Sequence, residues 1–384
     1  KNMKKLIFIF LLFIFVVPSL NQVNILETLK LKTFDALVPT QQPSGHFTIL
    51  NITEEDIADE GGYPLSRQTL AQIQINLLRK GAIGVGWVLA FPQPDRFGGD
   101  FDFTEALSFA PSVLAMYENN TSEYPETTGT VILGEDTGGI LAQGVVQNIE
   151  ILKANASQGV AVARTDVDSL VRRLPLLLRT PEGWVPAYGT EVLKVLADAD
   201  TYVIKGNANG LEEIRVKGLP AVQVDSLGRK WVSWVDTPQT DLREMDVENK
   251  FVFVGFTAKG IMPQIATPAG LLEPHKIQAA LAESILIENS PYIPDYALAV
   301  ELLVLVLTVS VVWLLLSYLG ITFGVLTATS VILCTMFYGY WTIQQNILID
   351  VTWSLISQFI TATVAFYLRF REQYKLRQQI KKQF

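Results

Sequence analysis

The sequence predicts an α/β/α sandwich with a mixed, mainly parallel sheet, held in a membrane by four transmembrane helices. Two observations carry this prediction. Between residues 46 and 288, short β-rich runs alternate with amphipathic helical stretches, a pattern typical of a parallel sheet covered by helices. The last third of the chain holds three apolar runs, each about 20 residues long, which is the length that a helix needs to cross a hydrocarbon core. These runs are Ala297–Tyr318, Ile321–Trp341 and Ile349–Leu368.

A fourth span is predicted at the N-terminus, where the apolar stretch Leu6–Val17 follows three lysines. Its length also suits the core of a signal peptide, but the segment Pro18–Gln22 offers no small-x-small cleavage site, which favours an uncleaved anchor. Basic residues precede the first span and follow the last, so both termini are expected in the cytoplasm of a bacterium. The prediction divides the chain into an anchor (1–20), a periplasmic or extracellular domain (21–295), a three-helix transmembrane bundle (297–368) and a cytoplasmic linker helix (369–384).

The charge balance restricts what the ectodomain binds. Residues 6–368 hold 21 Lys or Arg against 37 Asp or Glu, a net charge of −16. This acidic balance argues against nucleic acid or anionic lipid as the ligand of the ectodomain. Cys334 is the only cysteine and lies within a predicted span, so we expect neither an intrachain disulfide nor a thiolate metal cluster. With only two histidines, a histidine-based zinc site is not expected either.

The first part of the ectodomain predicts a strand–helix–strand unit. His46–Ile52 is a β-rich run, and a helix is expected from its N-cap Ser66 to Lys80, with Gly81 ending it. Ala82–Leu89 is a second apolar strand, which completes a βαβ unit. Two shorter strands are predicted at Val113–Met116 and Val131–Leu133.

The later part of the ectodomain predicts a buried strand, a hairpin and a helix. Phe251–Phe256 is too apolar for an edge strand and is expected at the centre of the sheet. Gln223–Val235 reads as a β-hairpin around a turn at Ser226–Gly228, which adds an antiparallel part. Glu273–Glu288 has the apolar spacing of an amphipathic helix.

Several segments occur in an order that matches a known family. They are Leu31–Asp35, Gly62–Arg67, Phe91–Asp100, Asp166–Arg179, Phe253–Ala258 and Ala266–Pro268. In this order, between one span and three, they resemble the type-2 CHASE domain, an extracytoplasmic sensory module of bacterial adenylyl cyclases, histidine kinases and Ser/Thr kinases. The resemblance covers nearly the whole chain, and it makes Arg67 and His275 candidate ligand-binding residues. Two acids usual in the family are absent, since Val88 and Gln93 stand at their positions, which puts a site built on them in doubt.

Polar side chains follow several predicted parallel strands, whose carboxyl ends form the crevice in which such sheets bind ligands. Glu54 and Asp56 follow the first strand, Asp95 and Arg96 follow the second, and Thr257 follows the later buried run. Acids, a hydroxyl and one arginine suit a small polar ligand. The alternative is a local role, in which the Asp95–Arg96 pair closes a turn and Thr257 caps a strand end.

Two further candidates have a ligand-binding and a structural interpretation. Arg172 and Arg173 are suited to receive a carboxylate through two hydrogen bonds each, or they brace a hairpin by pairing with the nearby Asp166 and Asp168. His275 at the start of a helix suits a ligand contact, or a capping and packing role. No nucleophile elbow, P-loop, paired metal carboxylates or dinucleotide fingerprint is found in the ectodomain, so no catalytic or metal-binding residue is assigned.

The segment after the last span predicts a continuous helix without Pro or Gly. Leu376 and Ile380 fit an a/d pattern with Gln373, which indicates a parallel dimeric coiled coil; a helix lying on the membrane surface is the alternative. Arg369, Leu376 and Ile380 are therefore the candidate signal-transmitting residues. The chain starts at Lys1 and stops within this helix, so we expect it to be part of a longer protein.

The expected function follows from the resemblance. Lys381–Phe384 resembles the linker that precedes the class III cyclase domain in family members, which implies the sensor of a homodimeric receptor with an adenylyl cyclase domain beyond Phe384. ATP and Mg²⁺ would belong to that domain, and no cofactor is expected in this chain. The ligand is expected to be a small molecule, an ion or an envelope protein. A non-signalling scaffold of the envelope is the alternative, and the lack of a nucleophile–base pair argues against a periplasmic enzyme.

Overall fold

The computed structural model describes residues 2–383 and divides the chain into two compact units. One unit runs from Thr40 to Asp295, and the other joins residues 2–39 to residues 296–383. We describe each unit by itself.

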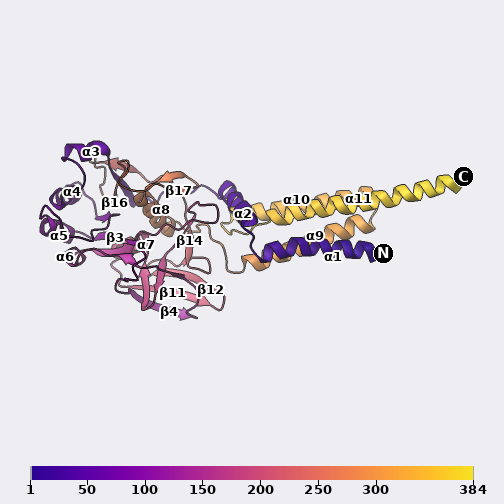
Figure 1. Cartoon of the computed structure of the whole chain (residues 1–384), viewed down its shortest axis with the longest axis horizontal. Helices are drawn as coiled ribbons and strands as arrows, with labels where there is room; N and C mark the ends of the chain where they lie inside the picture. Colours follow the sequence, from indigo (N-terminus) through magenta and orange to yellow (C-terminus); the bar gives the residue numbers. More distant parts are fainter. Residues whose placement is uncertain (1, 384) are drawn as a thin grey trace. The chain divides into compact units, whose positions relative to one another are not determined.

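The first unit is built on a seven-stranded sheet whose order is β15-β1-β16-β2-β3, with β6 and β7 both paired to β3 (Figure 1). All pairs are parallel except β3–β6, so the sheet is mixed but mainly parallel, as the sequence predicts. The strands are β1 (Phe47–Ile52), β2 (Gly84–Trp87), β3 (Ser112–Glu118), β6 (Val145–Val146), β7 (Ser157–Val160), β15 (Gln239–Asp241) and β16 (Phe251–Phe256).

Helices cover both faces of this sheet, because its central strand is apolar on both sides. In β16, Phe251 and Phe253 pack with α7 (Tyr188–Leu196) and α8 (Pro274–Leu286). Val252 and Val254, which alternate with them, pack on the opposite face with α4 (Arg67–Arg79) and α5 (Asp100–Ser108). All six residues of β16 are buried, as a central strand requires, and the α/β/α arrangement of layers follows from this alternation.

The local signals that define α4 act as predicted. The hydroxyl of Ser66 accepts a hydrogen bond from the Thr69 backbone amide at the N-cap, and Gly81 follows the helix with a φ of +94°. The two strands of the predicted βαβ unit, β1 and β2, are not neighbours in the sheet, because β16 lies between them.

The remaining strands of this unit form small sheets. β4 (Gly129–Gly134), β11 (Thr201–Asn207), β12 (Gly210–Val216) and β13 (Val222–Gln223) make a second sheet. A three-stranded sheet contains β5 (Ile140–Leu141), β9 (Leu177–Thr180) and β10 (Gly183–Pro186). Two two-stranded sheets are formed by β8 (Arg173–Pro175) with β14 (Arg229–Trp231), and by β17 (Ile265–Thr267) with β18 (Gly270–Leu272). Two short helices complete the unit, α3 (Glu54–Asp59) and α6 (Glu150–Lys153).

The predicted hairpin at Gln223–Val235 is wrong. Its turn exists, since the amide of Gly228 donates to the carbonyl of Asp225 and the amide of Asp225 donates to the carbonyl of Arg229, but the strands on either side, β13 and β14, do not pair with each other. β13 pairs with β12 and β14 pairs with β8. The reason is that each flank finds a strand partner from elsewhere in the chain.

The second unit consists of helices. These are α1 (Asn2–Leu20), α2 (Asn24–Leu37), α9 (Ala297–Tyr318), α10 (Ile321–Gln344) and α11 (Thr352–Gln383). Within the described residues, three helices are long and apolar enough to cross a membrane: α1 over Met3–Leu20, α9 and α10. The predicted span Ile349–Leu368 is not one of these three helices. Its residues from Thr352 onward form the first part of the longer α11.

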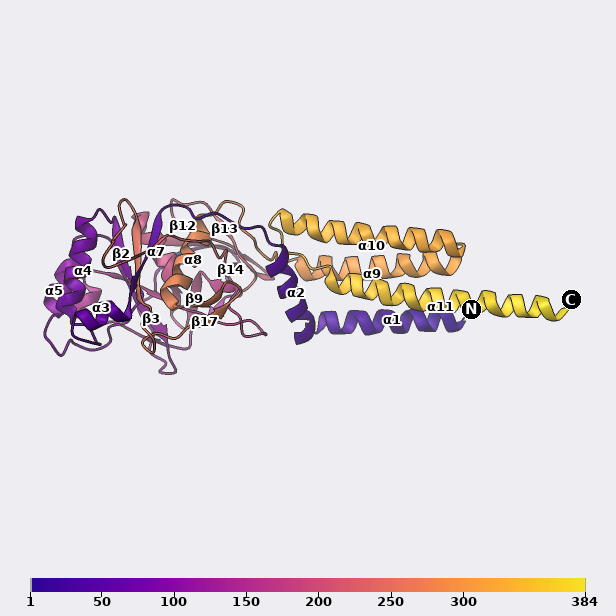
Figure 2. The ribbon, with the colours of Figure 1, turned by 90° about the horizontal axis from the view of Figure 1, so that it is seen from above.

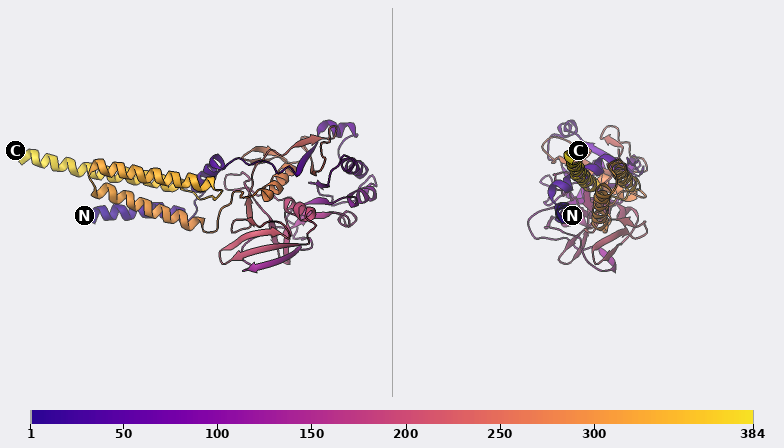
Figure 3. Two further views of the ribbon diagram at one scale, coloured as in Figure 1. Left: turned by 180° about the vertical axis from the view of Figure 1, so that it is seen from behind. Right: turned by 90° about the vertical axis from the view of Figure 1, so that its right-hand side faces the viewer.

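The helices of this unit pack along one another (Figure 2). Phe8 of α1 stacks on Trp313 of α9, with 5.5 Å between ring centroids. The indole nitrogen of Trp353 at the start of α11 donates to the carbonyl oxygen of Phe15 in α1 over 3.0 Å. The amide of Gln358 donates to Thr308 of α9 and Thr335 of α10. Polar contacts thus join α11 to three neighbouring helices. Figure 3 shows these helices from two further directions.

Candidate functional site

A pocket of about 460 Å³ lies at the carboxyl ends of β2 and β16. Its walls come from the segment before α4, from the loop after β2 and from Phe256 at the end of β16. Three of the predicted site residues, Arg67, Asp95 and Arg96, line it. We call it the strand-end pocket.

Arg67 is held in this pocket by an aromatic ring and a carbonyl group. Its guanidinium lies over the ring of Phe91, 4.2 Å from the centroid, and Nη2 donates to the backbone oxygen of Gln93 over 3.2 Å. Nη1 is buried and has no hydrogen-bond partner within the described residues. Burial lowers the pKa of Arg67, while the charges of Asp100 and Asp95 act in the opposite direction.

Asp95 organises the loop around it. Its carboxylate accepts hydrogen bonds from the backbone amides of Arg67 (2.9 Å), Phe97 (3.2 Å) and Gly99 (3.1 Å). Burial acts to raise the pKa of Asp95, but these amides together hold the pKa below its ordinary value. Arg96 is exposed and stacks on Phe97 at 4.7 Å. The geometry of Asp95 is therefore that of a loop-closing residue, and Arg67 is the polar group most available to a ligand.

Three predicted residues lie outside this pocket. Asp56 is buried and forms a capping box with Thr53, at 2.8 Å from the Thr53 amide nitrogen. Glu54 is exposed in the first turn of the same helix. Thr257 extends the pairing with β1, because its amide donates to the carbonyl of Ile52 over 3.0 Å.

The arginine pair at 172–173 makes its ion pairs within the chain. Arg172 is fully buried, and its Nη1 and Nη2 contact the two carboxylate oxygens of Asp168 at 2.7 and 2.8 Å. Arg173 donates from Nε to Asp166 at 3.0 Å. The hydrogen bonds from Arg172 keep the pKa of Asp168 below its ordinary value. This is the bracing geometry that the sequence offers as the alternative to ligand binding.

His275 is also buried, at 1% exposure, in the first turn of α8. Its Nε2 lies 2.9 Å from Oδ1 of Asn51 in β1. Burial, assisted by the charge of Lys276 and opposed by that of Glu273, lowers the pKa of His275 to about 3. Its ring lies so close to Gly255 that a Cβ there would approach the ring to 2.2 Å. The ring is thus a neutral packing group between α8 and the sheet.

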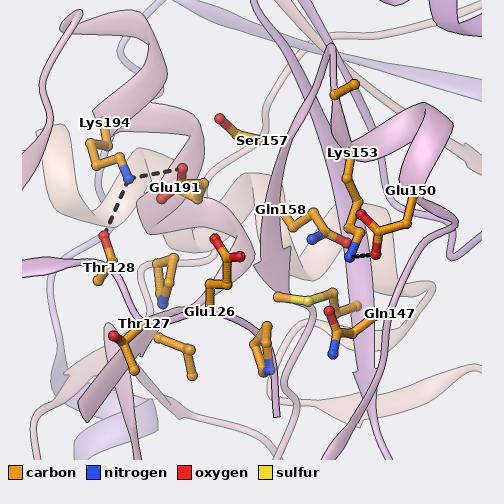
Figure 4. Close-up of a pocket in the computed structure, with 15 residues that line it drawn as sticks. Glu126, Thr127, Thr128, Gln147, Glu150, Lys153, Ser157, Gln158, Glu191 and Lys194 are labelled. Carbon is orange, nitrogen blue, oxygen red and sulfur yellow. Dashed lines mark hydrogen bonds and ion pairs between the residues drawn. The ribbon is translucent and has the colours of Figure 1, made fainter. Parts of the chain in front are cut away.

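The structure contains a second pocket in this unit, of about 420 Å³, that sequence reasoning missed (Figure 4). It lies where the edge of the large sheet (β3 and β7) meets α6, α7 and the segment leading into β4. Charged and amide side chains line it, so we call it the polar pocket. Its charged residues are Glu126, Glu150, Lys153, Glu191 and Lys194.

Glu191 and Lys194 form the innermost charged pair of the polar pocket. Glu191 is 3% exposed; its Oε1 lies 3.1 Å from Nζ of Lys194, and its Oε2 accepts from the hydroxyl of Tyr202 at 2.7 Å. Burial raises the pKa of Glu191, while the charge of Lys194 and the bond from Tyr202 act to lower it. Lys194 also donates to the hydroxyl of Thr128 over 3.3 Å.

A buried amide fixes one further lining group. Asn148 donates from its backbone and side-chain nitrogens to Oε1 of Gln158, over 3.2 and 2.8 Å. Because both contacts require an oxygen at that position, the amide nitrogen of Gln158 faces the pocket, where no described residue bonds to it. Asn148 itself is 4% exposed and also accepts from the amide of Phe91 at 2.7 Å.

Glu126 is the carboxylate of the polar pocket that has no partner. It makes no hydrogen bond or ion pair with the part of the chain that the structure describes, and Figure 4 shows its carboxylate directed between Glu191 and Gln158. Lys153, by contrast, pairs with Glu150 one helical turn away. A signal for the pocket existed in the sequence, since Glu191 and Lys194 interrupt the otherwise apolar helix of residues 188–196.

The predicted signal-transmitting residues lie on α11 with their side chains accessible. Leu376 and Ile380 are 57% and 55% exposed. Arg369 lies 3.8 Å from Glu372, and Glu372 lies 2.7 Å from Nζ of Lys4 in α1. Among the residues described, no group of three or more His, Cys, Asp and Glu side chains is arranged to hold a metal ion.

Comparison with known proteins gives one match. A family model described as the CHASE2 domain matches residues 8–319, which run from α1 to the end of α9. No curated protein and no solved structure matches the chain.

Proposed function

Since this chain belongs to the CHASE2 domain family, whose domain is an extracytoplasmic sensor, we propose that it is the sensory and transmembrane part of a dimeric bacterial receptor that controls adenylyl cyclase activity. The observation that carries the proposal is the position of the α/β unit. It is inserted between apolar helices, after α1 and α2 and before α9 and α10, and the chain then continues as α11. In this proposal, a change in the sensor is passed through these helices to the C-terminal helix.

A four-span topology is supported by contacts within the helical unit. Thr352 at the start of α11 hydrogen-bonds Thr33 of α2, and twenty residues later Glu372 pairs with Lys4 near the start of α1. α11 also contacts α1 through the bond from Trp353 to the Phe15 carbonyl, so α11 meets α1 at two places, near Phe15 and near Lys4. We propose that it spans the membrane with α1, which places both basic ends in the cytoplasm.

The output side of the proposal concerns α11. This helix is continuous from Thr352 to Gln383, so a displacement or rotation at its start is carried to its end. Leu376 and Ile380 lie one turn apart and are more than half exposed, as expected for residues that meet a second copy of the helix. A class III cyclase domain attached beyond Phe384 would sense that pairing.

The test uses the protein isolated from its native membrane. An intact mass that exceeds the mass of this chain by roughly 15–25 kDa is expected if an output domain follows. Cyclic AMP production by the intact protein is then compared with that of a variant lacking residues 40–295. The proposal fails if the variant keeps the full native regulation.

The second candidate is a non-signalling scaffold of the envelope. Val88 stands where the family usually has an acid, and its side chain is 1% exposed in the hydrophobic core. This favours the scaffold, because no ligand-binding acid is present at that position. A mass equal to that of this chain, together with stoichiometric recovery of one envelope protein, would support the scaffold.

A further inference from the structure

We propose that the polar pocket binds a small zwitterion, a molecule that carries one ammonium and one carboxylate group. Free amino acids and short peptides share this chemistry. The inference rests on the sensory role proposed above and assigns that role a ligand class and a site. It concerns residues that neither the family signature segments nor the strand-end pocket contains.

The polar pocket contains N–H donors that the described residues do not use. Lys194 has three N–H groups and uses two, on Glu191 and Thr128. Lys153 uses one on Glu150, and the amide nitrogen of Gln158 uses none. These donors come from α7, α6 and β7, on different walls of the same pocket. Two cationic donors and a fixed amide suit a carboxylate.

The polar pocket also contains a carboxylate with which no described residue pairs. Glu126 offers both carboxylate oxygens, and no described residue neutralises its charge. Such a group favours a ligand ammonium. Glu126 lies on the segment that leads into β4, so a ligand held between it and Lys194 would join this segment to α7.

The charge balance decides between ligand classes. Lys194 and Lys153 are each paired with a glutamate but keep unused N–H groups, while Glu126 carries the remaining negative charge; a simple anion would therefore meet an unpaired carboxylate, and a simple cation would leave those donors unused. A zwitterion satisfies both kinds of group at once. The pocket volume of about 420 Å³ lies within the range of small-molecule sites.

Glu191 forms a buried, fixed wall of the pocket, whereas Glu126 and Glu150 are exposed. Its carboxylate is fixed by Lys194 and Tyr202, and the orientation of Gln158 is fixed by the buried Asn148. The donors that would receive the ligand carboxylate are therefore positioned before it arrives, which reduces the entropy cost of binding.

The experiment is isothermal titration calorimetry on the full chain in detergent with four probes. L-Alanine and diglycine are zwitterions that differ in the separation of their charges; propionate and ethylamine each keep one of the two charges. We expect heat of binding from at least one zwitterion and at least tenfold weaker binding of both single-charge probes. Binding of L-alanine alone indicates a free amino acid as the ligand source, and binding of diglycine indicates a peptide.

Two variants and two matched controls locate the site. Glu126→Gln and Lys153→Gln each remove one charge from the pocket, and we expect each to weaken binding about tenfold. Glu123→Gln and Lys80→Gln remove equivalent charges from exposed residues outside it, and binding is expected to stay unchanged.

Three results overturn the inference: no binding of either zwitterion at 10 mM (roughly the upper limit for a weak site), equal binding of propionate or ethylamine, or equal affinity in the pocket variants and their controls. The readout is binding to the protein itself, so it is independent of any output domain. A receptor that regulates cyclic AMP but binds no zwitterion would leave the proposed function intact and refute only this assignment.

Discussion

His275 shows at the scale of one residue how burial sets a dependence on pH. The folded protein resists protonation of this ring because its pKa is lowered to about 3, whereas the unfolded chain takes up the proton near pH 6.5. Below pH 6.5 the unfolded state binds more protons, so the free energy of unfolding falls as the pH falls toward 3.

We therefore expect acidification from pH 7 to pH 5 to cost about 2 kcal/mol through this residue. The measurement is thermal unfolding of the protein and of His275→Gln at both values. The variant should lose less on acidification than the parent protein. Equal losses in the two proteins would contradict the assignment.

Lys230 is a second buried base, and its charge is sensitive to a higher range of pH. It is 1% exposed, and its Nζ contacts the backbone oxygens of Gln223, Ser290 and Pro291 at 3.4, 3.5 and 3.2 Å. Burial lowers the pKa of Lys230 to about 7. Between pH 7 and the unfolded value of about 10.5 the unfolded chain binds more protons, so stability rises with pH in this window.

Raising the pH from 7 to 9 is expected to stabilise the parent protein relative to Lys230→Met by about 2 kcal/mol, because in this range the unfolded chain keeps a proton that the buried amine of the folded protein has lost. Thermal shift measurements at both pH values on the two proteins test this. Parallel pH profiles would show that Lys230 stays charged throughout.

At the scale of elements, Gln358 connects three helices of the membrane unit. It is fully buried and donates to Thr308 at 2.7 Å and to Thr335 at 3.1 Å. In a lipid environment each such bond between helices contributes about 0.6–1.7 kcal/mol. Gln358→Leu should therefore lower the unfolding temperature of the detergent-solubilised protein.

Ser330→Ala provides the control for this change. Ser330 is exposed and bonds only to the Leu326 carbonyl of its own helix, so its loss should leave the unfolding temperature unchanged. If both variants unfold with the parent, the Gln358 bonds contribute nothing measurable to the packing of α11.

The elements also show what sequence alone can predict. The β16 strand and the α4 helix were predictable because their signals are local: six consecutive apolar residues in one, a serine cap and a terminal glycine in the other. The partners of β13 and β14 were not, because the local pattern does not say that β13 pairs with the preceding β12 and β14 with the distant β8. The strand-end pocket was partly predictable from strand order, whereas the polar pocket draws its walls from separate segments between residues 116 and 194.

At the scale of the whole molecule, the number of spans decides which side of the membrane the C-terminal helix occupies. With α1, α9, α10 and α11 crossing, Gln378 lies in the cytoplasm; with three crossings it lies outside. We predict that, in a Cys334→Ala background, a membrane-impermeant maleimide labels Lys217→Cys in intact spheroplasts and labels Gln378→Cys only after lysis. Labelling of Gln378→Cys in intact cells would refute the four-span topology.

The buried amide of Asn148 lines neither pocket but contacts one lining residue of each. One end of its side chain fixes Phe91, on which Arg67 of the strand-end pocket stacks, and the other end orients Gln158 of the polar pocket. A ligand that altered Gln158 would change the free energy of the Phe91 loop, and thermodynamic reciprocity requires the reverse effect to be equal. Hydrogen exchange at the Phe91 amide, measured with the polar pocket empty and filled, reads this heterotropic coupling directly; an unchanged exchange rate would mean that the two pockets act independently.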